Sequence, residues 1–252
     1  MFKTTLKPML CASALLVGVS SSQALYAHTR LQINTLDENT RSYNTVVIGH
    51  GCDDGRAVIG TSVIFPDGVD SVLEDITDPQ NPKALRQPLS SVVKNWGGLL
   101  SVVKTKEIFD YQGIKRDANG KIIGFWAGGG EGLPDGGWLG LVPFRINGVQ
   151  FDENACAKSV TFVVPIADIC QITPASGFSN STVNLWTPAV GSHFDGPGLD
   201  GFNSPATLKI NRKSALPASC GAGIDVKVIP SAAQINRDLP IKIGNQQIWP
   251  RP

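Results

Sequence analysis

The chain has 252 residues and nearly balanced charge, with 22 Lys and Arg against 21 Asp and Glu. This length suits one large β domain or two small ones, and we expect one. The balance, without blocks of like charge, excludes strongly basic nucleic-acid-binding proteins and polyelectrolyte tails. After residue 27 no apolar run approaches the roughly 18–20 residues of a membrane span, so we expect no span in the mature form.

The first 27 residues have the layout of a secretory signal peptide. Two lysines precede an apolar run over 9–19, and the segment ends at the small residue Ala27. We therefore expect export across the inner membrane, to the periplasm or the extracellular space. Removal of residues 1–27 leaves His28 as the first residue. Its α-amine and ring Nδ1 can close on one metal ion as a chelate, and such nitrogen ligation suits Cu(II).

A hairpin is expected next. Residues 28–34 alternate polar and apolar, residues 42–50 are rich in β-branched side chains, and turn-forming residues lie between them. Antiparallel pairing around this turn places His28 opposite Gly49 and beside His50, at the roughly 4.5–5.5 Å that separates cross-strand Cβ atoms. A slip of one residue would turn His50 to the other face.

The loop after the hairpin contains two adjacent acids, Asp53 and Asp54, close to His50. Their carboxylates are candidate metal ligands, although acids in loops also serve simply as turn formers. Residues 57–65 then read as a strand. Residues 74–91 are rich in Asp, Pro, Gln and Asn without periodicity, and we expect a long connection there.

Short strands separated by turns continue from there to residue 210. We expect them at 99–105, 108–111, 122–126, 138–146, 159–164, 183–186 and 206–210. The glycine-rich segment 128–137 lacks the Gly-Lys-Ser/Thr ending of a phosphate-binding loop and is expected to form a wide turn. The loop over 187–201 carries His193, a surface residue unless this loop folds over His28.

The absence of sustained 3.6-residue periodicity after the signal predicts an all-β chain. Many short strands with Gly and Pro turns favour an immunoglobulin-like or cupredoxin-like β-sandwich, which we assign to residues 28–210. The sequence becomes less regular beyond that point. We therefore interpret residues 211–252 as a C-terminal extension with candidate strands at 224–229 and 239–243.

Four cysteines follow the signal: Cys52, Cys156, Cys170 and Cys220. An even number in an exported chain favours disulfides, and three pairings are possible. None of the cysteines is spaced as Cys-x-x-Cys, which argues against a thiolate zinc site or a redox motif.

The order of several motifs resembles that of the YcnI-like copper-binding domains, which are exported β-sandwich proteins. The matching pieces are His28 after the signal, Ser42-Tyr43, His50-Gly51-Cys52-Asp53, Ile64-Phe65-Pro66-Asp67-Gly68-Val69, Trp126 followed by Leu133-Pro134-Asp135-Gly136, Cys170, and Trp186-Thr187-Pro188. Together they span residues 28 to about 210.

The resemblance implies copper held by the N-terminal histidine and a carboxylate, with a tryptophan close to the ion. His28 matches the histidine and Trp186 the tryptophan, although a core position is an equally good interpretation of Trp186. The segment that supplies the carboxylate in the family is here the His-Gly-Cys-Asp loop, so His50 or Asp53 takes its place. The resemblance also favours a Cys52–Cys170 disulfide, since both cysteines lie in matched segments, which leaves Cys156 with Cys220.

These observations favour an exported Cu(II)-binding protein, a chaperone or scavenger that exchanges copper with a membrane transporter or a cuproenzyme of the envelope. We identify no catalytic set of residues and expect no enzyme. Two other hypotheses stay open. One is a copper-dependent oxidase resembling lytic polysaccharide monooxygenases, which also use an N-terminal histidine on a β-sandwich. The other is a metal-free exported sandwich used for adhesion or assembly.

Overall fold

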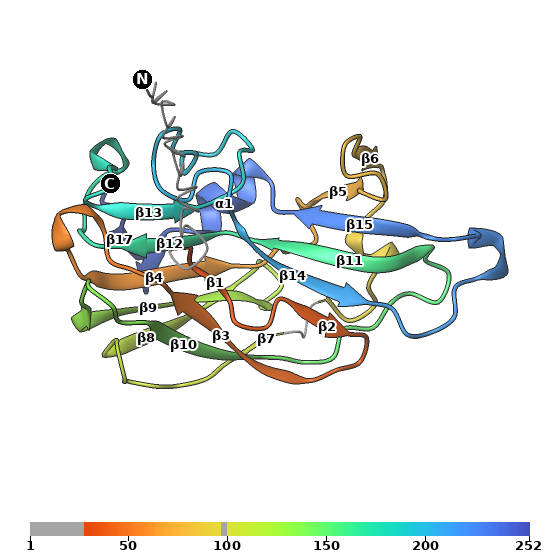
Figure 1. The fold of residues 1–252 in the computed structure, drawn as a ribbon, viewed down its shortest axis with the longest axis horizontal. Coiled ribbons are helices and arrows are strands. Elements are labelled where there is room, and N and C mark those ends of the chain that lie inside the picture. Colours follow the sequence, from red (N-terminus) through yellow and green to blue (C-terminus); the bar gives the residue numbers. More distant parts are fainter. Residues whose placement is uncertain (1–27, 97–99) are drawn as a thin grey trace, which may run out of the picture.

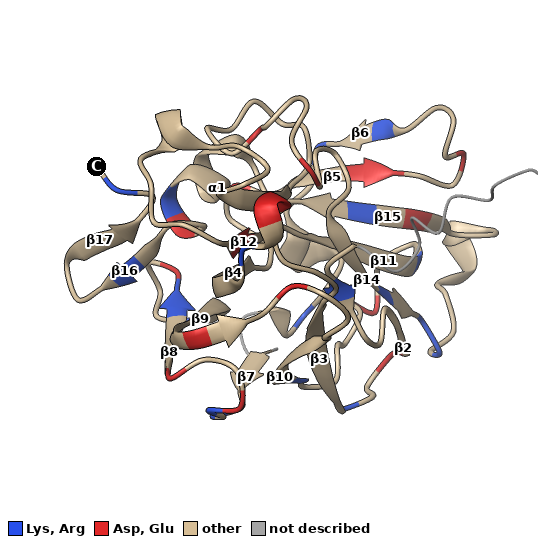
Figure 2. Cartoon of the chain, turned by 60° about the vertical axis from the view of Figure 1, so that its left-hand side comes forward, with Lys and Arg blue, Asp and Glu red and all other residues tan. Residues whose placement is uncertain are grey.

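A computed structural model describes residues 28–96 and 100–252 of the chain, and the proposed signal peptide lies outside these ranges. The regular secondary structure of the described part is nearly all β, as predicted (Figure 1). None of its helices is long and apolar enough to cross a membrane. Positive and negative side chains are interspersed over the strands and loops (Figure 2).

The strands form three main sheets and one hairpin. In the four-stranded sheet the order is β1 (Arg30–Leu31), β3 (Ser42–Ile48), β10 (Gly140–Ile146), β7 (Leu100–Val102). In the six-stranded sheet it is β2 (Thr35–Asp37), β14 (Ala206–Asn211), β11 (Ala157–Val164), β15 (Ile224–Ile229), β5 (Val72–Asp75), β6 (Lys83–Leu85). In the five-stranded sheet it is β13 (Val183–Trp186), β12 (Ile166–Ile169), β4 (Val58–Ile64), β9 (Ile122–Leu133), β8 (Tyr111–Arg116). A hairpin of β16 (Ile241–Ile243) and β17 (Gln246–Trp249) and the helix α1 (Ala232–Asp238) complete the described elements.

A sandwich results because the three sheets share one apolar core. In Figure 1, β13, β12, β11 and β15 run along one side, and β3, β10 and β7 along the other. Alternate residues of facing strands fill the space between them, such as Phe144 of β10 and Phe162 of β11, neither of which is exposed. The strands β11 and β12 are separated only by Pro165, which has no N–H to donate, so one extended segment serves two sheets.

The predicted hairpin has the predicted register but is shorter. The strand β1 pairs with β3 through two residues only. The Asn44 side chain then closes the ladder, because its amide accepts from Ile33 N at 3.0 Å and donates to Ile33 O at 2.7 Å. Residues 36–37, which were predicted as turn, belong to β2, which pairs in parallel with β14 in the other sheet.

Two predicted connections are wrong. Residues 74–91 contain part of a short hairpin between β5 and β6. The glycine-rich segment lies largely inside β9, which runs on to Leu133 against β4. The glycines allow this close pairing, since a Cβ on Gly132 would lie 2.4 Å from Val58 O, and the φ of +73° at Gly132 fits a bulge in the ladder.

The segment 211–252 is packed into the sandwich rather than appended to it. The strand β15 lies between β11 and β5 and is parallel to β11. The helix α1 and the β16–β17 hairpin cover the outer face of the five-stranded sheet with a second apolar cluster that includes Ile235 and Trp249. The seven residues of α1 are too few to produce sustained helical periodicity, which is why the sequence did not reveal it.

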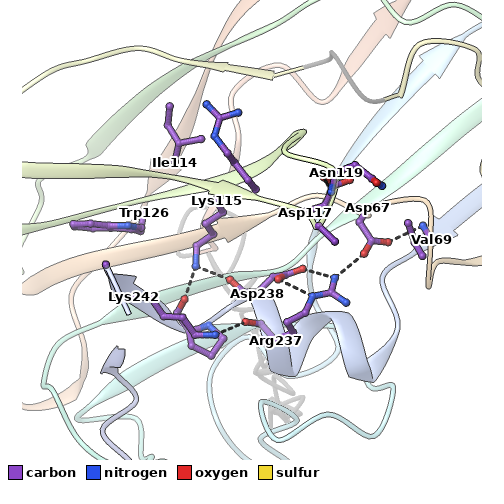
Figure 3. Close-up of a pocket in the computed structure, with 14 residues that line it drawn as sticks. Asp67, Val69, Ile114, Lys115, Asp117, Asn119, Trp126, Arg237, Asp238 and Lys242 are labelled. Carbon is purple, nitrogen blue, oxygen red and sulfur yellow. Dashed lines mark hydrogen bonds and ion pairs between the residues drawn. The ribbon is translucent and has the colours of Figure 1, made fainter. Parts of the chain in front are cut away.

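A buried lysine caps the C-terminal end of α1. Lys115 of β8 donates through Nζ to the main-chain carbonyls of Asp238, Leu239 and Pro240, at 2.6, 3.2 and 2.6 Å. Figure 3 shows Lys115 directed toward Asp238 at this end of the helix. The last carbonyls of a helix have no partner within the helix, and a cation is favourable there. Beside it, Arg237 donates to the buried carboxylate of Asp67 at 2.6 Å. These contacts fix the C-terminal segment to β8 and to the turn after β4.

Both predicted disulfides are present. Cys52 is joined to Cys170 across 118 residues, and Cys156 to Cys220 across 64 residues. The first connects the loop after β3 with the end of β12. The second connects the segment before β11 with the segment before β15.

Candidate metal centre

The end of the sandwich where β1 and β3 meet brings two histidines to one tryptophan. Arg30 pairs with Val47, which is the predicted register, and His28 lies two residues before this pair. The imidazole centroids of His28 and His50 lie 4.9 and 6.1 Å from a ring centroid of Trp186, the His50 contact being edge-on. Three of the four residues predicted for the site therefore lie together.

His50 has one ring nitrogen committed to its own loop. His50 lies two residues beyond Ile48, the last residue of β3, and its ring contacts Trp186. Its Nδ1 lies 2.5 Å from Gly51 O. Because a carbonyl oxygen only accepts, Nδ1 carries the proton of the neutral ring, and Nε2 keeps the lone pair with which imidazole binds metals.

The main chain next to His50 is held by two other segments. Gly51 N donates to Asp135 Oδ1 at 3.2 Å, and Asn184 of β13 donates from Nδ2 to Gly51 O at 3.1 Å. A Cβ on Gly51 would lie 2.3 Å from Arg56 O, so only glycine fits this turn. The loop that orients His50 is therefore fixed by the turn before β10 and by the strand of Trp186.

Trp186 lies over a buried carboxylate that the sequence did not reveal. Trp186 is the last residue of β13 and is 2% exposed. Its indole Nε1 donates to Asp168 Oδ2 at 3.0 Å. Asp168 lies on β12, a four-residue strand that was not predicted. Burial raises the pKa of Asp168, while hydrogen bonds from Thr29, Thr61 and Trp186 oppose that rise.

The other candidate residues lie in different surroundings. Asp53 is exposed in a 3-10 helix over Asp53–Gly55, and its amide N donates to Asn180 O at 3.0 Å. His193 is exposed on the loop after β13, where its amide donates to Asn236 Oδ1 at 2.7 Å. Neither contact connects these residues to the two histidines beside Trp186.

Among residues 28–96 and 100–252, no group of three or more His, Cys, Asp or Glu side chains is arranged to hold a metal ion. A chelate of the kind expected for His28 needs fewer such side chains, because the α-amine supplies one of its nitrogens. The arrangement around Trp186 thus offers two imidazoles, with an indole face beside them and a carboxylate underneath.

Comparisons with known proteins identify no family. No protein-family model matches the chain, and no curated protein is significantly similar to it. Among solved structures, the chain is similar to an uncharacterized protein from Nocardia farcinica that is described as having an immunoglobulin-like fold. That similarity has a TM-score of 0.40 and 12% sequence identity, and it covers 73% of this chain and 99% of the other.

Proposed function

We propose that this chain is an exported protein that binds one Cu(II) ion through the α-amine and imidazole of His28 and through Nε2 of His50, with Trp186 beside the ion. The observation that carries this proposal is the contact of both imidazoles with the same indole. Two imidazoles against one indole can supply nitrogen ligands to a single ion, and a nitrogen-rich ligand set suits Cu(II).

The donor chemistry of the described residues fits this ion. The Gly51 carbonyl holds the neutral His50 ring in the tautomer that leaves Nε2 as a ligand, which is the usual role of a second hydrogen bond on a metal-binding histidine. Trp186 is almost fully buried, so its indole would shield one side of the ion from water. The Asp168 carboxyl group accepts the indole hydrogen bond and so holds Trp186 in place beside the proposed ion.

Export and a role in copper handling belong to the same proposal. Residues 1–27 have the layout of a secretory signal, and the two disulfides fit an oxidising compartment such as the periplasm. A binding site without a catalytic set of residues suits a chaperone or scavenger. Its partner would be a copper transporter or a cuproenzyme of the envelope.

The position of His28 at the N-terminus provides the main test. We expect the chain beginning at His28 to bind one Cu(II), and a chain with one extra Met before His28 to bind it at least about a hundred-fold more weakly, because the chelate requires a free α-amine. Isothermal titration with Cu(II), after intact-mass confirmation of both N-termini, measures this. Equal binding by the two chains would refute the proposed ligands, and no binding by either would favour a metal-free sandwich.

The second ligand is tested by comparing His50 with Asp53. We expect His50→Ala to weaken Cu(II) binding by about ten-fold or more, and Asp53→Ala to change it by less than about three-fold, since imidazole is the better Cu(II) ligand. Electron paramagnetic resonance should show fewer nitrogen couplings in His50→Ala. Trp186→Phe should change the copper spectra or redox behaviour more than the affinity. An unchanged nitrogen pattern in His50→Ala would instead assign the site to His28 and an acid.

The second histidine beside the first also favours one alternative function, a copper oxidase resembling lytic polysaccharide monooxygenases. Such an enzyme would also use the nitrogens of two histidines around one copper ion. Peroxide production by the copper-loaded protein with ascorbate separates the two functions. We expect a rate no higher than that of free Cu(II), because a protein that stores or transfers copper must suppress this reaction.

A further inference from the structure

The carboxylate of Asp168 connects three segments beneath the two histidines. Asp168 is fully buried on β12. Its Oδ2 accepts from Thr29 Oγ1 at 2.5 Å and from Trp186 Nε1 at 3.0 Å, while its Oδ1 accepts from Thr61 Oγ1 of β4 at 2.8 Å. One oxygen atom is thus shared by the residue that follows His28 and by the indole that His28 contacts.

The chemistry of this cluster requires an acceptor without donors of its own. Thr29 and Trp186 both donate a hydrogen bond to Oδ2 of Asp168. Thr61 donates one to Oδ1 of the same carboxylate. An ionised carboxylate can accept all three hydrogens, whereas an amide or hydroxyl side chain would bring a donor into the cluster. Hydrogen bonds to a charged group are also stronger than neutral ones, which offsets part of the cost of burying the charge.

Several contacts hold the chain near His28, among them a hydrogen bond from Arg30 Nη1 to His28 O at 3.4 Å. The strand β1 pairs with β3 through only two residues, and it begins at Arg30. Chain ends fray unless they are tied down. Thr29 is buried, with 3% exposure, and its hydroxyl bond to Asp168 fixes the main chain immediately next to His28.

We propose that Asp168 is a positioning residue, which holds His28 against Trp186 by joining the Thr29 hydroxyl and the indole N–H at one oxygen atom. It does not bind the ion itself, because both of its oxygens are buried and already accept hydrogen bonds. Its effect on copper binding rests on the function proposed above. The positioning of His28 does not, and can be measured without metal.

The cluster contains its own matched control. Thr29→Val and Thr61→Val each remove one hydroxyl donor to the same carboxylate, at buried positions and with little change in side-chain shape. Only Thr29 is next to His28. Both variants keep two of the three donors to Asp168, so both are expected to fold and to lose similar stability. A role of Asp168 in stability alone would affect the two variants alike.

The first measurement uses the metal-free protein. Nuclear Overhauser effects between the His28 ring and the Trp186 indole, assigned with the help of Trp186→Phe, report whether the two rings stay in contact. We expect these effects to be lost in Thr29→Val and retained in Thr61→Val. Retention in both variants, or loss in both, would overturn the proposal.

The second measurement is titration with Cu(II) of the same proteins, each beginning at His28. We expect Thr29→Val to bind at least about ten-fold more weakly than the parent, and Thr61→Val to remain within about three-fold of it. Equal affinities of the two variants would overturn a role of Asp168 in copper binding. If the parent binds no Cu(II) while the Overhauser effects differ as expected, the proposed function fails and the positioning of His28 by Asp168 stands.

Discussion

We expect the free energy of unfolding to rise as the pH increases from about 7 to about 10.5, because Lys115 is buried in the folded protein. Burial lowers the pKa of Lys115 to about 7, while the nearby Asp238 carboxylate opposes this change. In the unfolded chain the lysine has its ordinary pKa of about 10.4. Between these values the unfolded chain binds more protons than the folded one, so deprotonation favours folding.

The size of this effect has an upper limit on the order of 4–5 kcal/mol, at about 1.36 kcal/mol for each pKa unit. The three carbonyls around Nζ favour the charged amine and reduce the effect below that limit. Urea unfolding at a series of pH values measures it. Lys115→Met should remove most of the rise, whereas Lys121→Met, at an exposed lysine, should retain it. A rise of equal size in Lys115→Met would show that other groups cause it.

The strands that the sequence predicts best are those with clear turns at both ends. The strands β13 and β15 begin and end at the predicted residues, and β14 differs by one residue. The register of β1 and β3 was also predicted, because turn-forming residues limit how the two segments can align. That register placed His50 beside His28, so most of the candidate site was accessible from the sequence alone.

Asp168 shows why the remainder was not accessible. The strand β12 is buried along its whole length and carries Ile166, Ala167 and Ile169 around the acid, so it has no alternation to recognise. An acidic residue within a short apolar segment suggests a turn. Its place in a strand is understood only once the groups that donate hydrogen bonds to its carboxylate are known. Those donors come from Thr29, Thr61 and Trp186, which are distant in sequence and meet only in the fold.

The glycine-rich part of β9 was missed for a different reason. Local turn chemistry predicts a loop there, but close pairing with β4 overrides it. A Cβ on Gly132 would lie 2.4 Å from Val58 O, so the absence of a side chain is what allows the strands to approach. Such close contacts between two backbones cannot be read from one of the two segments alone.

The Cys52–Cys170 disulfide is expected to contribute both to stability and to the candidate site. It closes a loop of 118 residues, and removing a native disulfide typically costs roughly 2–5 kcal/mol. His50 lies two residues before Cys52, and Asp168 lies two residues before Cys170. The bond thus connects the loop of one imidazole with the strand whose carboxylate holds Trp186.

We expect the double variant Cys52→Ala/Cys170→Ala to lower the free energy of unfolding by about 2–5 kcal/mol and to weaken Cu(II) binding by about ten-fold, because the His50 loop then loses its covalent link to the end of β12 and is held by hydrogen bonds such as those to Asp135 and Asn184. The matched control is Cys156→Ala/Cys220→Ala, which removes the other disulfide. It should also destabilise the protein, yet leave Cu(II) affinity and the contact of His50 with Trp186 unchanged, since its cysteines precede β11 and β15.

Urea unfolding and Cu(II) titration of both variants, at a temperature where both are folded, measure the two effects separately. Equal loss of copper binding in the two variants would mean that overall stability, rather than the connection between the His50 loop and β12, determines the affinity.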